Sequence, residues 1–217
     1  MPLNDRDYMR RSQQPSRGGY RGGGFNDWIT QNPVLALIAL NIVFFVVTSI
    51  QPNIKDSLGL NPLLITRRPW TLLTAMFVHY DIWHILFNML ALFYFGRMLT
   101  IIVGTGRFLI IYFVGGILGN LLFLAINYAT PELLIGASGA VYAVAGALVV
   151  LVPTARISFW GVIPMPLWVY TLIFLVLLSL PPFVPLGIAW QAHMGGLATG
   201  LVGGFLWRRT GKYYYFR

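Results

Sequence analysis

The sequence predicts an all-α membrane protein, a bundle of six transmembrane helices with both termini in the cytoplasm. The composition gives the first indication, because 57% of the 217 residues are hydrophobic and only 10% are charged. A water-soluble domain of this length does not need that balance to build its core. The second indication is a series of six apolar segments of roughly membrane-crossing length. The third is the placement of basic residues at the ends of these segments.

The six apolar segments set the predicted order of helices. A helix that crosses the hydrocarbon needs about 20 mostly apolar residues. The fourth and fifth segments are short by this standard, and a glycine-containing stretch precedes the fourth. We therefore expect the fourth helix to begin below the membrane surface, where irregular backbone is tolerated only if protein or a water-filled cavity surrounds it. The segments are residues 33–50, 82–102, 108–128, 138–152, 167–180 and 188–207.

The basic residues predict the orientation. If the amino terminus is cytoplasmic, all fifteen lysines and arginines lie inside except Lys55, Arg67 and Arg68. These three fall in the long first loop, residues 51–81, which contains three prolines and which we interpret as a structured external element. The positive-inside rule therefore places both termini in the cytoplasm. The formal charge of +9 indicates contact with anionic membrane lipid rather than a nucleic-acid partner.

The chain divides into three predicted parts. Residues 1–28 form a basic, Gly/Arg-rich disordered cytoplasmic tail, because the low-complexity stretch 16–24 cannot bury enough surface to fold. RNA binding by this tail is the alternative interpretation. Residues 29–207 form the helical domain, and residues 208–217 form a short basic cytoplasmic tail. The chain contains no cysteine, which excludes disulfides and thiolate chemistry.

Polar residues interrupt the second, fourth and sixth segments. His84, Ser138 and His193 each lie within the first turn or two of their segment, and polar residues in lipid are functional candidates because they are costly there. In the predicted topology these three segments all run from outside to inside. With a rise of about 1.5 Å per residue, the three side chains lie at a similar depth, about one or two turns below the outer surface.

Ser138 and His193 together indicate hydrolytic chemistry. Ser138 lies between Gly136 and Gly139 at the start of a helix, where free N–H groups stabilise negative charge. A serine hydroxyl is a weak nucleophile until a base removes its proton, and histidine is suited to that task. The alternatives are that Ser138 is only a helix N-cap and that His193 is a hydrogen-bonded bystander.

Small residues predict contact between the fourth and sixth helices. Gly196, Gly200 and Gly204 share a face with His193, and such a stripe lets two helix backbones approach closely. We expect this contact to deliver His193 to Ser138, although packing alone would also explain the stripe. The matching small residues of the fourth segment are Gly139, Ala143, Gly146 and Ala147.

The expected site is a Ser-His dyad rather than a triad. Asp81 and Glu132 are the only acids near the six segments, and both are predicted in outer loops, away from His193. Tyr142 shares a helix face with Ser138 at an offset of four residues, which makes it a candidate for orienting the histidine.

His84 and Asn88 also share a helix face at an offset of four residues. Both side chains can donate hydrogen bonds to a developing oxyanion. The alternative for Asn88 is a hydrogen bond that ties two helices together.

Metal and aspartyl chemistry have less support. The chain lacks a His-Glu-x-x-His motif and has no aspartate within a predicted span. His79, His84 and His193 could form a three-histidine metal site, but nothing supplies an evident second shell. We therefore expect no metal and no cofactor.

These motifs together resemble the rhomboid intramembrane serine proteases. The resemblance covers roughly residues 70–206 and is carried, in order, by Trp70, His79, His84-x-x-x-Asn88, Gly136-x-Ser138-Gly139 with Tyr142, and Ala192-His193-x-x-Gly196-x-x-x-Gly200. It implies a rhomboid-like six-helix bundle in which Ser138 is the nucleophile and His193 its general base. It also implies an oxyanion site formed by the Asn88 and His84 side chains and the Ser138 backbone N–H, with Tyr142 packed against His193.

The resemblance also implies the substrate class. Rhomboid proteases cut single transmembrane helices near their outer ends and need no cofactor. We accordingly expect a multi-pass integral membrane protein, located in the plasma membrane, whose partners are single-span membrane proteins and membrane lipid. Two positions depart from the family pattern: Thr71 follows Trp70 where the family often has arginine, and Thr100 replaces a frequent glutamate. The departures concern loop anchoring and stability more than chemistry.

Two other functions compete with this interpretation. An inactive rhomboid-like protein would bind membrane helices without cutting them, but such relatives typically lack the serine or the histidine, and this chain keeps Ser138 and His193. A six-helix transporter could also place polar residues at helix breaks. The sequence shows no evident repeat relating its halves and no charge within a span to couple ions.

Overall fold

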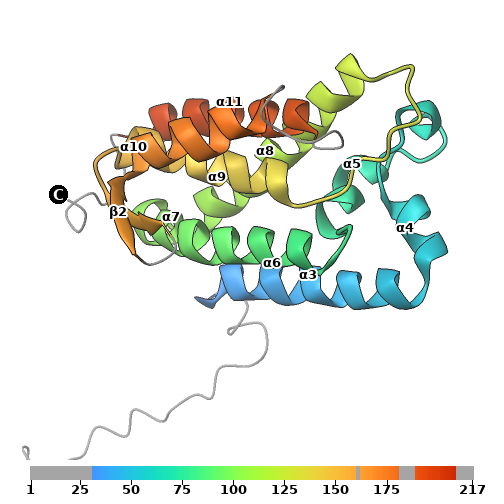
Figure 1. Cartoon of the computed structure of the whole chain (residues 1–217), viewed down its shortest axis with the longest axis horizontal. Coiled ribbons are helices and arrows are strands. Elements are labelled where there is room, and N and C mark those ends of the chain that lie inside the picture. The colour runs from blue at the N-terminus through green and yellow to red at the C-terminus, as the bar shows by residue number, and fades with distance from the viewer. Residues whose placement is uncertain (1–30, 160–161, 181–188, 209–217) are drawn as a thin grey trace, which may run out of the picture.

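The computed structural model describes residues 31–159, 162–180 and 189–208, which form a helical bundle (Figure 1). The predicted tail at residues 1–28 lies outside the described residues, and so does the predicted tail at residues 208–217 apart from its first residue.

The predicted apolar segments are helical over most of their described residues, although two of them change helix type along their length. The second runs from α-helix through a π-helical stretch and back, and the fifth passes from α-helix through π-helix to a 3-10 turn. The helices are α3 (Pro33–Ile50), α6 (Ile82–Ala91), η3 (Leu92–Gly96), α7 (Arg97–Val103), α8 (Thr105–Ile126), α9 (Ser138–Leu151), α10 (Leu167–Tyr170), η4 (Thr171–Val176), η5 (Leu177–Ser179) and α11 (Trp190–Trp207).

Three of the described helices are long and apolar enough to cross a membrane: α3, the continuous run Ile82–Val103, and α8. The fourth and fifth segments are shorter, as predicted. Helix α9 has 14 residues and is therefore about 21 Å long, against a hydrocarbon thickness of about 30 Å. Six crossings and the cytoplasmic placement of both termini remain predictions.

The predicted bounds of the third helix were wrong by a few residues at each end. Helix α8 begins at Thr105 rather than Phe108, because Gly104 adopts a φ of 85° that turns the chain directly from α7 into α8. It ends at Ile126 rather than Tyr128. There the Asn127 side chain bonds back to the Phe123 carbonyl, 2.9 Å away.

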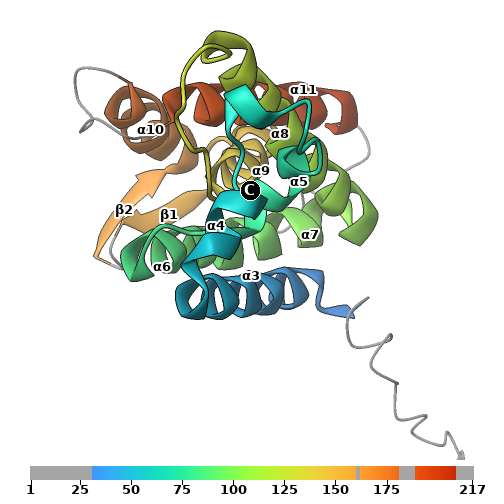
Figure 2. The same ribbon diagram turned by 90° about the vertical axis from the view of Figure 1, so that its right-hand side faces the viewer.

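Helix α9 occupies the centre of the bundle, as the end-on view in Figure 2 shows. Every residue from Gly139 to Leu148 is buried, and the neighbouring helices cover it on all sides. This explains why the segment is apolar around its whole circumference rather than along one stripe.

The predicted contact between the fourth and sixth helices is confirmed. A Cβ atom built on Gly196 would lie 2.0 Å from the Gly139 carbonyl oxygen, and one on Gly200 would lie 1.9 Å from that of Ala143. Such distances are possible only without a side chain, so the glycines of α11 bring its backbone directly against α9. Helix α8 joins them closely, since a Cβ on Gly119 would lie 2.5 Å from the Ala192 carbonyl oxygen of α11.

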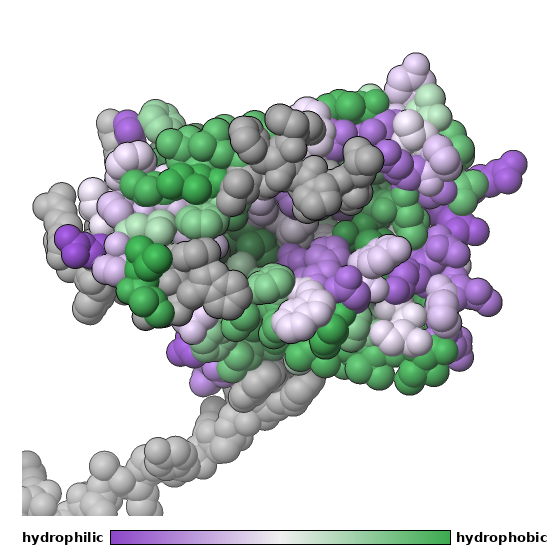
Figure 3. Space-filling view, viewed as in Figure 1, coloured by the Kyte–Doolittle hydropathy of each residue, from purple (hydrophilic) through white to green (hydrophobic). Residues whose placement is uncertain are grey.

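The first loop is structured, as predicted, and contains α4 (Pro52–Leu58), η1 (Pro62–Leu64), α5 (Thr71–Thr74) and η2 (Ala75–Phe77). The Trp70 indole N–H donates to the Ser57 carbonyl at 3.1 Å, and the Arg68 guanidinium donates to the Asp56 carbonyl at 2.8 Å. The arginine that precedes Trp70 therefore anchors the loop, even though Thr71 follows the tryptophan. In Figure 3 hydrophilic residues gather at the end of the molecule where Figure 1 shows α4 and α5.

A β-hairpin joins the fourth and fifth segments and was not predicted. Strands β1 (Arg156–Phe159) and β2 (Ile163–Pro166) pair antiparallel, with Arg156 opposite Pro166. Four-residue strands carry too little hydrophobic alternation to be distinguished from a loop by pattern alone.

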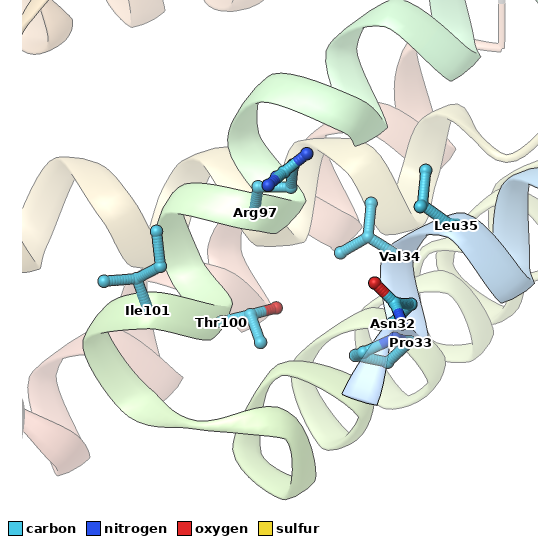
Figure 4. A pocket seen from close by; sticks show the side chains of 7 residues that line it. All are labelled: Asn32, Pro33, Val34, Leu35, Arg97, Thr100 and Ile101. Atoms are coloured by element: carbon cyan, nitrogen blue, oxygen red, sulfur yellow. The ribbon is translucent and has the colours of Figure 1, made fainter. Parts of the chain in front are cut away.

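A shallow pocket lies between the start of α3 and helix α7, and Figure 4 shows its lining side chains. It includes Arg97 and Thr100, whose hydroxyl donates to the Gly96 carbonyl at 2.7 Å. The Thr100 hydroxyl is thus hydrogen-bonded within its own helix, at the position where the family often has a glutamate. Arg97 is thirteen residues from His84 along the second segment, so the two residues are about 20 Å apart along the helix.

Candidate active site

Ser138 and His193 meet at the junction of α9 and α11. The Ser138 Oγ lies 2.8 Å from the His193 Nε2, within hydrogen-bonding distance. Ser138 is the first residue of α9 and His193 lies in the first turn of α11, 55 residues later in the chain. The N-cap position of α9 is Ala137. The N-cap alternative for Ser138 is therefore wrong, because Ser138 lies one residue inside the helix.

Gly136 controls the entry of the chain into α9. Its φ of 128° is accessible mainly to glycine, and a Cβ there would lie 2.7 Å from the His84 Nε2. The irregular backbone before Ser138 is held by the first loop, since Gly136 N–H donates to the Ala75 carbonyl at 2.9 Å. Leu60 and Leu134 exchange two backbone hydrogen bonds of 2.9 and 2.8 Å. These bonds satisfy polar groups that would be costly in lipid.

His84 is held through both its ring and its backbone. Asp81 caps α6 by accepting the His84 backbone N–H at 2.8 Å, and the Tyr80 backbone N–H donates to His84 Nδ1 at 3.3 Å. A neutral imidazole that accepts at Nδ1 carries its proton on Nε2. The positions of the His84 Nε2 and of the Ser138 Oγ are 2.7 and 3.7 Å from the Cβ that Gly136 lacks. A donor N–H and the serine hydroxyl therefore border the same small space.

Asn88 is buried one turn further along α6. Its side-chain N–H donates to the His84 carbonyl at 2.8 Å, which leaves its second amide N–H and its oxygen outside this bond. The bond lies within one helix, so it does not tie two helices together.

Tyr142 packs face to face on His193, as the family resemblance implied. The ring centroids are 4.2 Å apart and the planes differ by 16°. The Tyr142 hydroxyl is hydrogen-bonded to the hydroxyl of Ser179, a buried residue of η5. Sequence reasoning missed Ser179. The signal was a small hydroxyl residue in an apolar segment, but a serine there usually bonds its own helix backbone.

His79 lies next to His84 in the loop before α6, with ring centroids 5.1 Å apart. It is fully buried, and burial, followed by the neighbouring His84, lowers the pKa of His79 to about 3. It is therefore a neutral side chain at ordinary pH. Within residues 31–159, 162–180 and 189–208, no group of three histidine, cysteine or acidic side chains could hold a metal ion.

Comparison with known proteins shows the family of the chain. Residues 66–210 match the family model of the Rhomboid domain. The chain is 32% identical to rhomboid protease GluP of Bacillus subtilis over 77% of its own length and 32% of that protein. It is 30% identical to the putative rhomboid protease YdcA of the same organism over 86% of this chain and 94% of YdcA. It is 30% identical to RHOMBOID-like protein 1 of Arabidopsis thaliana over 68% of this chain and 36% of that one.

The chain therefore belongs to the rhomboid family and is an integral membrane protein. It spans about a third of the length of GluP and of RHOMBOID-like protein 1, and nearly all of YdcA.

Proposed function

We propose that this protein is an intramembrane serine endopeptidase that cleaves transmembrane helices near their outer ends. The observation that carries the proposal is the 2.8 Å contact between the Ser138 Oγ and the His193 Nε2. A serine hydroxyl and an imidazole at that distance are the minimal pair for acyl transfer. The half-buried serine and the buried histidine lie among apolar helices.

In the proposed reaction, His193 Nε2 accepts the Ser138 proton as the Oγ attacks the scissile carbonyl carbon. The protonated imidazole then donates to the departing amine, and an acyl-enzyme remains on Ser138. In the second half, His193 removes a proton from water as the water attacks the ester. The proton then returns to the Ser138 Oγ as the new carboxyl end leaves.

The negative charge on the tetrahedral oxygen needs donors beside Ser138. The His84 Nε2–H borders this space, and the first backbone N–H groups of α9 have no partner within the helix. Asn88 supplies the remaining side-chain donor of the proposal through the amide N–H that its bond to the His84 carbonyl leaves over. Each such donor typically contributes about 3 kcal/mol to the transition state.

The proposed substrates are single-span membrane proteins. A continuous helix has its peptide carbonyls occupied by internal hydrogen bonds, so the scissile bond must lie where the helix ends or unwinds. This favours cleavage near the outer end of the substrate helix, at the depth we predict for Ser138. A rhomboid-like protein that only bound helices would not need the contact between Ser138 and His193.

A serine-directed fluorophosphonate tests the proposal together with a panel of single-span helices. We expect the purified protein to be labelled on Ser138 and to produce fragments of defined mass, and Ser138→Ala to lose both activities while it stays folded. Ser49→Ala is the matched control, because the hydroxyl of this exposed serine only bonds the Phe45 carbonyl of α3. Equal cleavage by the parent and by Ser138→Ala, with contaminating proteases excluded, would falsify the nucleophile assignment.

A further inference from the structure

The orientation of His193 depends on unusual support, and the following inference rests on the proposed function of that residue as a base. In serine hydrolases a third group normally bonds the second ring nitrogen and orients the imidazole. Among the residues that the structure describes, the His193 Nδ1 has no hydrogen-bond partner. The contact that defines the plane of the imidazole is instead the face of Tyr142, 4.2 Å away and nearly parallel.

A stacked ring orients its neighbour only if it is held in place itself. Tyr142 is held at both ends. Its backbone belongs to the buried helix α9, and its hydroxyl is bonded to the hydroxyl of Ser179. Tyr142 is 9% exposed and Ser179 is 4% exposed, so water has little access to replace the bond. Losing either hydroxyl would leave the other buried without this partner.

Ser179 is the last residue of η5, which follows the π-helical stretch η4 in the fifth segment. It is 37 residues from Tyr142 in the chain and belongs to neither of the helices that carry Ser138 and His193. We propose that Ser179 is a positioning residue for proton transfer: it holds Tyr142, and through the stacked ring it holds His193 against Ser138. The fifth segment thereby contributes to catalysis without contacting the reacting atoms.

A double-mutant cycle on the two hydroxyls tests this inference. The variants are Ser179→Ala, Tyr142→Phe and their combination, measured for the rate of fluorophosphonate labelling and for the kcat and KM of one helix substrate. We expect each single variant to lower the labelling rate and kcat by about five- to tenfold, the effect of one neutral hydrogen bond on a rate, with KM little changed. The double variant should be no slower than the singles, because one bond is lost in all three.

The small probe separates positioning from substrate entry, because it does not require a helix to enter the bundle. Ser179→Thr keeps a hydroxyl and should recover most of the rate. The control is Thr171→Val, which removes another buried hydroxyl of the same segment, one that has no hydrogen-bond partner among the described residues. We expect Thr171→Val to label at the parental rate.

Two results would overturn the inference: parental labelling and kcat in Ser179→Ala, or single effects that multiply in the double variant. If Ser179→Ala does not fold, Tyr142→Phe decides alone, since it keeps the stacked ring and a parental rate would contradict the proposal. Failure of the proposed function is distinct, because the parent protein would then not be labelled on Ser138.

Discussion

Asn88 donates one side-chain hydrogen bond to the His84 carbonyl of its own helix. We expect Asn88→Ala to lower kcat by about ten- to a thousandfold while KM changes much less, because a donor to the oxyanion acts mainly in the transition state. kcat and the melting temperature should be measured on the same preparation. A lowered melting temperature with normal kcat would remove Asn88 from the oxyanion site and leave it a structural role.

His79 makes stability depend on pH. Burial, and then the adjacent His84, lowers the pKa of His79 from 6.5 to about 3. Between pH 6.5 and pH 3 the unfolded state binds a proton at His79 that the native state does not bind. The contribution of His79 to the free energy of unfolding is therefore complete above pH 6.5 and falls as the pH drops toward 3. Between pH 8 and pH 5 we expect a loss of about 2 kcal/mol from this group.

Unfolding in mixed micelles at several pH values measures this dependence, and His79→Gln should flatten it. His84 and His193 contribute their own protons, so the comparison of the variant with the parent isolates His79. An identical pH dependence in both proteins would show that the pKa of His79 is the same in the native and unfolded states.

At the scale of the element, α11 contacts α9 mainly through the backbone at its glycines rather than through side chains. A Cβ at Gly200 would lie 1.9 Å from the Ala143 carbonyl oxygen, which is rigid backbone, whereas one at Gly203 would meet the flexible Ile111 side chain at 3.3 Å. We expect Gly200→Ala to destabilise the protein by about 1–3 kcal/mol or more and to reduce activity, because α11 must move away from α9.

Gly203→Ala is the matched control on the same helix and should cost much less. Melting temperature and fluorophosphonate labelling of both variants provide the comparison. Equal stability of the two variants would mean that α11 can shift without cost, and the contact between α9 and α11 would then not position His193.

The sequence was most informative where periodicity carries the signal. The spacing of Gly196, Gly200 and Gly204 predicted the contact with α9, and apolar length predicted the helices to within a few residues. Partners chosen by tertiary structure were not predictable. The bond between Tyr142 and Ser179 joins residues 37 positions apart, and the strands 156–159 and 163–166 are too short for a pattern. No local rule encodes either one.

At the scale of the whole molecule, the first loop and the chain before α9 form one unit. Leu60 pairs with Leu134, and Ala75 accepts the Gly136 N–H. The loop also reaches the core through α8, because the Asn120 side chain donates to the Leu72 carbonyl at 2.8 Å. Residues from the first and third connections thus support Ser138 together, which explains how irregular backbone is accommodated there.

The burial of α9 has a consequence for the lipid around the protein. A helix that faces lipid must match the thickness of the bilayer by tilting or by deforming the membrane. Helix α9 is short, and its residues from Gly139 to Leu148 are buried in protein. Because lipid does not contact this stretch, the bilayer thickness does not act on it directly. The serine at its start is therefore placed by the protein framework. A membrane with longer acyl chains would change the position of a substrate helix relative to Ser138, but not the position of Ser138 in the protein.

In bilayers of graded thickness we expect the cleavage position on one substrate to shift while the rate of fluorophosphonate labelling stays constant. A labelling rate that followed acyl-chain length would show that lipid reaches the site through the outer helices.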